Sequence, residues 1–187
     1  PVFWNTLHDC VLEAMQSASI VPGEIKAISY SSQANSFVLL DGRNKPLTPL
    51  ILWPDKRAAK TCLPDWGLPY KDEFLIRTGL GVNFNYEFMA AKIYWFQKER
   101  HEIWKQVNCI LSISDYLTAE LTGKKFSDTG TTSLTGFLDV TAGQLWDKSL
   151  KLFNLNPDFF AIPLRTGSFA GALTKTGAEL IGLNTGI

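Results

Sequence analysis

IKAISYSSQANSFVLLDGRNKPLTPLILWPDKR, residues 25–57, combines the densest strand pattern of the chain with its densest cluster of polar side chains. Residues 25–31 alternate, which predicts a strand, and residues 37–41 form the continuous apolar run of a strand covered on both faces. Residues 41–44, DGRN, supply the turn chemistry of a hairpin. Residues 50–53 predict a third strand, which ends at Pro54 because proline cannot donate to a ladder.

Outside this stretch the chain is mainly helical. Apolar spacing and end signals predict helices over residues 1–20, 55–62, 72–78, 87–100, 114–123, 146–153 and 174–182. In the helix over 87–100, Lys92 falls outside the apolar face, and Ser114 or Asp115 is the expected N-cap of the helix over 114–123. Residues 63–86 are predicted to be a loop-rich insertion, and residues 124–140 a hydroxyl-rich loop.

Composition excludes several classes of protein. The 187 residues are 45% hydrophobic, which is enough for a globular core, and 18 basic against 18 acidic side chains lack the positive charge that nucleic acid demands. No apolar run of about 18 residues and no leader is visible, so we expect neither a membrane span nor secretion. Cys10, Cys62 and Cys109 fit neither a disulfide framework nor a zinc site, and we interpret them as small buried residues of a cytoplasmic protein.

The two ends indicate a piece of a longer protein. Helical spacing is already established at the first residues, without an initiator Met, and Ile187 stands where a strand is expected to start.

The chemistry of the chain is concentrated in the opening stretch. His8 and His101 are the only histidines and are expected on the surface, and no complete phosphate-binding loop is present. Gln33 and Asn35 fall between two predicted strands, while Trp53, Asp55 and Arg57 fall at the end of a third. Amides, a carboxylate, a guanidinium and an indole suit a sugar, because each hydroxyl donates and accepts while the carbon skeleton stacks on an aromatic ring.

A plainer interpretation of the same residues stays open. Gln33 and Asn35 also suit a turn, Asp55 suits an N-cap, and Arg57 suits a solvated helix surface.

The stretch ISYSSQANSFVLLDGRNKPLTPLILWPDKRA resembles the N-terminal domain of the FGGY family of carbohydrate kinases. In that family a segment I-x-x-S-G-Q-x-H-x-x-V-L-L-D precedes P-x-I-L-W-x-D-x-R-A, and xylulose kinases give the nearest pattern. The resemblance continues through RTG at 77–79, AAKIYWFQKERHEIW at 90–104, ISDYLTAELTG, SDTGTTSLTGFLDV, Trp146 and the closing GALTKTGAELIGLNTGI. It therefore covers nearly the whole chain.

The resemblance implies a fold, a reaction and a set of partners. The fold is α/β and ribonuclease H-like (actin-like ATPase), with a mixed central sheet, flanking helices and a helical insertion. The family transfers the γ-phosphoryl group of ATP, with Mg²⁺, to a sugar hydroxyl between two domains. Residues 1–187 would be a partial sugar-binding N-terminal domain without its first strands, and the partners would be the sugar and the chain's own C-terminal ATP-binding domain. A homodimer stays open.

Site residues carry over position by position. Gln33, Ala34 and Asn35 occupy the Gln-Met-His place that contacts the sugar in xylulose kinases, and the changes at Ala34 and Asn35 leave the particular sugar open. Trp53 matches the Trp that lines the polyol site of glycerol kinases, and Asp55 and Arg57 match the W-x-D-x-R pattern and support the site wall.

No catalytic residue is expected in the chain. The family's phosphate-binding D-x-G-T strand would lie before Pro1 and its catalytic Asp beyond Ile187, so we expect the chain to be inactive alone. A kinase for another ketose, a sugar acid or glycerol, a non-catalytic sugar-binding or regulatory module, and a purely structural domain are the alternatives.

Overall fold

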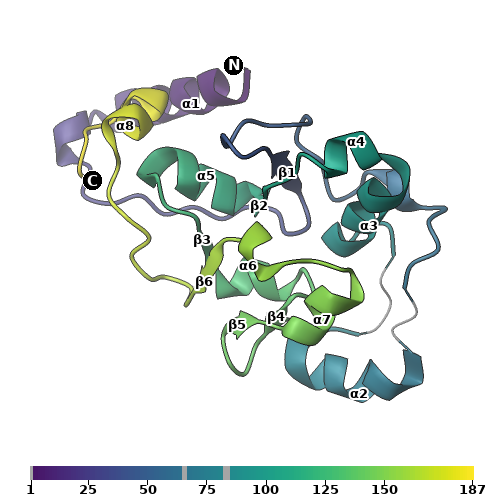
Figure 1. Cartoon of the computed structure of the whole chain (residues 1–187). Coiled ribbons are helices and arrows are strands. Elements are labelled where there is room, and N and C mark those ends of the chain that lie inside the picture. Colours follow the sequence, from purple (N-terminus) through teal and green to yellow (C-terminus); the bar gives the residue numbers. More distant parts are fainter. Residues whose placement is uncertain (1, 65–66, 82–84) are drawn as a thin grey trace. The chain divides into compact units, whose positions relative to one another are not determined.

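The structure is a computed structural model that describes residues 2–64, 67–81 and 85–187. Its elements are drawn in Figure 1. Contacts divide the chain into two compact units, each described by itself below. Unit 1 comprises residues 1–31, 117–124 and 169–187, and unit 2 comprises residues 32–116 and 125–168.

Unit 1 is helical. The predicted first helix is confirmed as α1 (Val2–Ala18), which lies beside α8 (Lys175–Ile181) (Figure 1). The end of α5 (Ile113–Thr122) completes this unit, and a short 3-10 helix, η1 (Pro22–Glu24), follows α1. The core of the unit consists of Leu121, Leu173, Ala178 and Ile181, with Trp4, Leu7 and Leu183 packed against it.

The α8 helix begins and ends at two well-defined residues. Thr174 caps it by accepting from the Gly177 N–H at 3.0 Å, and Gly182 ends it at φ +71°, where a residue with a side chain would be strained. Gly177 lies so close to α5 that a Cβ there would stand 2.1 Å from the Leu121 carbonyl oxygen. Only glycine allows this approach.

The strands of unit 2 pair as three two-stranded sheets. β1 (Phe37–Leu40) and β2 (Cys109–Ser112) are antiparallel with Phe37 opposite Ser112, and every residue of both is buried, which confirms the strand predicted from the continuous apolar run. β3 (Phe126–Asp128) pairs in parallel with β6 (Ile162–Leu164). β4 (Leu138–Asp139) pairs antiparallel with β5 (Gln144–Leu145).

Helices complete unit 2. They are η2 (Lys56–Ala58), α2 (Gly67–Thr78), α3 (Met89–Glu99), α4 (His101–Trp104), α6 (Thr129–Ser133), α7 (Asp147–Leu152) and η3 (Pro157–Phe159). They enclose an aromatic core built on Phe37, Phe74, Phe96, Phe137 and Phe153. The predicted helices over 87–100 and 146–153 are confirmed as α3 and α7.

The strand predicted over residues 25–31 is wrong. These residues are in neither a helix nor a strand, and most of them are exposed. Alternation alone does not make a strand, because its N–H and C=O groups need a neighbouring strand, and no described segment pairs with this one.

The predicted hairpin after β1 forms, but it is short. Asp41 fixes the turn by accepting from the backbone N–H of Arg43 at 2.8 Å and of Lys45 at 2.9 Å. The strand predicted over 50–53 is reduced to a single bridge between Phe37 and Ile51, since Pro46, Pro49 and Pro54 lack the N–H that a longer ladder needs.

Helix boundaries differ from prediction in three places. The helix predicted over 55–62 is only η2, because a first turn followed by Thr61 and Pro64 is too short to propagate. α2 begins five residues before the predicted 72–78, and residues 65–66 and 82–84 of the predicted insertion lie outside the described residues. Residues 124–140, predicted as a loop, contain β3, α6 and β4.

The α5 N-terminus is capped differently from prediction. Ser112, and not Ser114 or Asp115, holds it: Ser112 Oγ accepts from the Asp115 N–H at 3.2 Å, and Asp115 Oδ2 accepts from the Ser112 N–H at 3.0 Å. This reciprocal pair is a capping box.

The prediction of three buried cysteines holds only for Cys109. Cys10 lies on the exposed part of α1, and Cys62 is exposed in the loop after η2. The apolar spacing of α1 does not include Cys10, and Cys62 follows a helix that ends too early to bury it.

Candidate functional site

The turn at residues 33–36 enters β1 through Asn35. Its backbone adopts φ +63°, a left-handed conformation that asparagine tolerates better than other residues with side chains. Its Oδ1 accepts from the Met89 N–H at 2.9 Å, and its Nδ2 donates to the Leu134 carbonyl at 3.1 Å. Asn35 therefore ties the start of α3 and the end of α6 to this turn, as the plainer interpretation predicts for a turn residue.

Ser36 connects the turn to the segment that carries Trp53. The buried Ser36 hydroxyl donates to Gln33 Oε1 at 2.9 Å and accepts from the Trp53 N–H at 2.9 Å. Gln33 is exposed, Ala34 is half-buried, and 43% of Trp53 remains exposed. The structure thus brings the predicted residues Gln33, Asn35 and Trp53 into one connected group, which we call the amide–indole wall.

Lys92 is the residue of this site that the sequence did not predict. It was placed outside the apolar face of its helix, yet it is 0% exposed. Its Nζ donates to the carbonyls of Trp53 and Glu87, at 2.8 Å each. Burial lowers the pKa of Lys92 to about 8, although the Asp55 carboxylate opposes that shift. A long charged side chain is usually exposed, so the sequence alone predicts Lys92 on the surface. Its burial is explained by the two backbone carbonyls that accept hydrogen bonds from its ammonium.

Asp55 and Arg57 pair with each other. Arg57 Nε donates to Asp55 Oδ1 at 2.9 Å and its terminal NH₂ group to Oδ2 at 2.7 Å, while Asp55 Oδ1 also accepts from the Arg57 backbone N–H. These bonds lower the pKa of Asp55 to about 2. The guanidinium also lies 5.2 Å from the centre of the Phe96 ring. The predicted N-cap role of Asp55 is confirmed, and the bidentate pair packs against α3 as part of the structure of this region.

A groove of about 440 Å³ lies beside this pair. Its lining includes Asp55 and Arg57 together with Thr48, Trp95 and Arg100. The Trp95 ring is flanked by two guanidinium groups, with that of Arg100 at 4.8 Å from the ring centre and that of Arg57 at 5.4 Å. Asp55 compensates the charge of Arg57, whereas the Arg100 guanidinium donates to the Glu99 carbonyl at 2.8 Å, so the groove lining has one more basic than acidic side chain.

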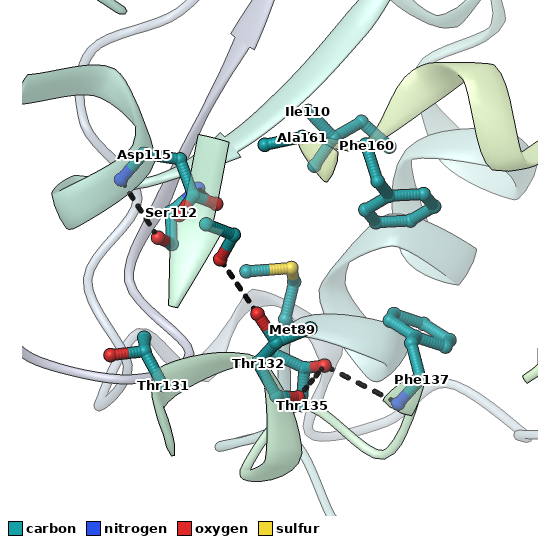
Figure 2. A pocket seen from close by; sticks show the side chains of 11 residues that line it. Met89, Ile110, Ser112, Asp115, Thr131, Thr132, Thr135, Phe137, Phe160 and Ala161 are labelled. Atoms are coloured by element: carbon teal, nitrogen blue, oxygen red, sulfur yellow. Dashed lines mark hydrogen bonds between the residues drawn. The ribbon is translucent and has the colours of Figure 1, made fainter. Parts of the chain in front are cut away.

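A smaller cavity of about 20 Å³ lies elsewhere in unit 2, bounded by Met89 of α3, Asp115 of α5 and Thr132 of α6 (Figure 2). A water molecule needs roughly 10–15 Å³ measured in this way, so the cavity has room for about one water and none for a sugar.

The described residues contain no cluster of metal-ligating side chains. Within the described ranges, no three His, Cys, Asp or Glu side chains gather as metal ligands. Asp55, the acidic residue next to the amide–indole wall, has both carboxylate oxygens held by Arg57. Because it is paired in this way, Asp55 is not suited to hold Mg²⁺. In the part of the chain that the structure describes, no helix is both long and apolar enough to cross a membrane.

The fold matches solved carbohydrate kinases. A gluconate kinase from Lactobacillus acidophilus superposes with a TM-score of 0.83 over 98% of this chain and 36% of its own, at 20% sequence identity, which establishes the mixed α/β architecture of the actin-like ATPase domain. The class that the fold defines is thus the mixed α/β domain of the actin-like ATPases. The chain belongs to the FGGY family of carbohydrate kinases: the sequence profile of the family's N-terminal domain matches residues 2–187.

Curated relatives carry several names. The chain is 30% identical over 178 residues to the xylulose kinase of Lactococcus lactis subsp. lactis (strain IL1403), covering 89% of this chain and 34% of that protein. It is 27% identical over 190 residues to the autoinducer-2 kinase of Escherichia coli (strain K12), covering 98% and 34%. The chain therefore spans about a third of the length of the curated relatives it matches.

Proposed function

We propose that this chain forms the acceptor-binding wall of an ATP-dependent carbohydrate kinase, with a ketopentose such as xylulose as the first candidate acceptor. The observation that carries the proposal is the link through Ser36, which joins the backbone N–H of the exposed Trp53 to the turn that carries Gln33 and Asn35. An indole and amide groups on linked segments suit the two needs of a sugar, stacking for its carbons and paired donors and acceptors for its hydroxyls.

Within this wall the residues differ in what they can offer. Gln33 is exposed, and its Oε1 accepts from Ser36, so its amide NH₂ is suited to donate to a sugar hydroxyl. The Oδ1 of Asn35 accepts from Met89, and one N–H of its amide donates to Leu134. The second N–H of this amide would donate to a ligand. Ala34 contributes no polar group. Asp55 and Arg57 would support the wall through their ion pair.

A different acceptor is the second candidate, because the relatives include an autoinducer-2 kinase and a gluconate kinase beside the xylulose kinase. The short side chains at Ala34 and Asn35 favour an acceptor that reaches further toward the turn than xylulose does. A non-catalytic sugar-binding module is the alternative in which the wall is kept and the chemistry is lost.

The sites for ATP and Mg²⁺ would lie in the rest of the protein, and a C-terminal domain would be the intramolecular partner. A homodimer stays open. We propose a cytoplasmic location. The chain alone is then expected to transfer no phosphate, and detectable ATP-dependent phosphorylation of any sugar by these 187 residues would refute that part of the proposal.

Sugar binding tests the wall itself. Calorimetric titration of the protein with D-xylulose, D-gluconate and glycerol is expected to give saturable binding for at least one of them. Trp53→Ala should weaken that binding at least about tenfold, whereas Tyr70→Ala, which removes an aromatic side chain of similar exposure on α2, should not. Absence of binding to every member of the panel would favour a structural domain.

A further inference from the structure

A second route besides Ser36 joins the amide side of the wall to its indole side, and it runs through the first turn of α3. Asn35 Oδ1 accepts from the N–H of Met89, the first residue of α3, at 2.9 Å. On the same helix, Lys92 Nζ donates to the Trp53 carbonyl at 2.8 Å. Since Ser36 follows Asn35 in the chain and accepts from the Trp53 N–H at 2.9 Å, these hydrogen bonds close a ring.

The ring holds both backbone groups of Trp53, while 43% of the residue remains exposed. The N–H donates to Ser36, and the carbonyl accepts from Lys92. A residue has two soft backbone dihedrals, and fixing the peptide groups on both sides of its Cα fixes both of them. The direction in which the Trp53 side chain leaves the backbone is therefore set, and with it the rotamers that the indole can adopt.

Lys92 does more than satisfy two carbonyls. It is 0% exposed, and its ammonium donates to the carbonyls of Trp53 and Glu87 at 2.8 Å each. A neutral amide or a water molecule would satisfy a carbonyl without the cost of burying a charge. What the long lysine side chain adds is a fixed connection from α3 to the segment that carries the indole, 39 residues earlier in the chain.

We propose that Lys92 is a positioning residue of the acceptor site, which sets where the Trp53 indole lies relative to the Asn35 amide and thereby which acceptor the wall fits. Lys92 is fully buried, so it acts through Trp53 and does not touch the acceptor itself. This role rests on the proposed function, because that function makes the acceptor the ligand of Trp53.

A substitution of Lys92 should therefore weaken the binding of the acceptor and leave the transfer of phosphate unchanged. In Lys92→Met the Trp53 backbone is held at its N–H alone, so the indole must be ordered when the acceptor binds, and that ordering reduces the affinity. The expected change is a higher KM for the acceptor. A general loss of folded enzyme would instead lower kcat and leave KM unchanged.

Steady-state kinetics of the longer kinase at pH 7 test this expectation, with whichever of D-xylulose, D-gluconate and glycerol it phosphorylates. Lys92→Met should raise KM for the acceptor about 3- to 10-fold and leave kcat and KM for ATP within about twofold of wild type. Lys98→Met, the same substitution at an exposed position of α3, is the matched control and should change none of these constants. An unchanged KM for the acceptor in Lys92→Met would overturn the role of Lys92 and leave the proposed function intact.

A double-mutant cycle with Trp53→Ala separates the two proposals further. Trp53→Ala alone should lower kcat/KM for the acceptor at least about tenfold, and the absence of any effect would count against the proposed function itself. If Lys92 acts through Trp53, adding Lys92→Met to Trp53→Ala should lower kcat/KM by no more than about a further twofold. Independent actions would multiply to a total loss of about 30-fold or more, which would overturn the role of Lys92.

A crystal structure of the wild-type longer kinase with the same acceptor decides the case if Lys92→Met does not fold. We expect the Trp53 indole to contact the acceptor, with Lys92 Nζ at about 2.7–3.2 Å from the Trp53 carbonyl oxygen. A complex in which the indole contacts the acceptor while Lys92 Nζ lies beyond hydrogen-bond distance of that oxygen would contradict the proposal.

Discussion

Replacing Lys92 by Met removes a buried charge and leaves most of the packing intact. Lys92 is 0% exposed, and its ammonium holds two backbone carbonyls, those of Trp53 and Glu87, at 2.8 Å. Met has a similar length and no donor, so Lys92→Met isolates the contribution of the ammonium from that of the side-chain stem.

Two opposing effects determine how much Lys92→Met changes the free energy of unfolding at neutral pH. Each carbonyl left without its donor costs about 1–3 kcal/mol. The opposing effect is the cost of burying the charged lysine in the wild type, which the variant avoids. The fall of the Lys92 pKa from 10.5 to about 8 corresponds to a cost of about 3 kcal/mol. The two effects largely cancel, so we expect the free energy of unfolding at pH 7 to change by no more than about 3 kcal/mol.

The dependence on pH separates the two effects. Between pH 8 and pH 10.5 the folded protein has released the Lys92 proton while the unfolded chain still holds it, so stability rises with pH. This gain is complete above 10.5 and is lost as the pH falls through about 8. The charged groups that act on the ammonium are Asp55, Glu87 and Arg57.

Urea unfolding of wild type and Lys92→Met from pH 7 to pH 10 is the assay. The wild type should gain about 3 kcal/mol relative to the variant over this range. Lys60→Met, which removes an exposed lysine, should follow the wild type and accounts for the titration of other groups. If the free energy of unfolding changed with pH in the same way for wild type and Lys92→Met, the reasoning would be refuted.

Three further predictions concern the wall and the two units. Asn35→Ala and Asn35→Gly should both lower kcat/KM for the acceptor about 10- to 100-fold in the longer kinase. Only the Ala variant should also lose about 1 kcal/mol of its free energy of unfolding, because alanine is strained at φ +63°. Unchanged kinetics with intact folding would leave Asn35 a turn residue. Gly177→Ala should reduce the free energy of unfolding by about 1–3 kcal/mol because its Cβ meets the Leu121 carbonyl, whereas Gly42→Ala, with nothing nearby, should be neutral by the same denaturation measurement. Asp55→Asn should cost about 2 kcal/mol at pH 7, with the difference vanishing as the pH falls through about 2, because the lowered pKa of Asp55 contributes stability only above that range; a difference in stability that persists in acid would argue against the ion pair as its cause.

The sequence predicted best what depends on local pattern. The continuous run Phe37–Leu40, the capped helix Lys175–Ile181 and the turn at Asp41 all follow from residues close together in the chain. Residues 25–31 show where this ends, since their alternation is typical of a strand but no described segment pairs with them.

The site could be predicted only as a set of residue types. The sequence predicted Gln33, Asn35 and Trp53 as one set, and the structure links Gln33 to the Trp53 backbone through Ser36, the residue after Asn35. The burial of Lys92 could not be predicted, because its two acceptors are the backbone carbonyls of Trp53 and Glu87. Every residue has such a carbonyl, so the sequence does not show which ones will accept.

The most direct test of the central claim is phosphate transfer from ATP, with Mg²⁺, to a panel of ketoses, sugar acids and polyols by the longer protein that carries this chain, measured for wild type and Trp53→Ala. The account predicts turnover of at least one panel member by the wild type and a loss of kcat/KM of at least about tenfold in Trp53→Ala, the size expected when one aromatic contact is removed. Turnover that is indifferent to Trp53→Ala would show that the acceptor is held elsewhere, and no turnover of any sugar would contradict the claim that this wall serves a kinase.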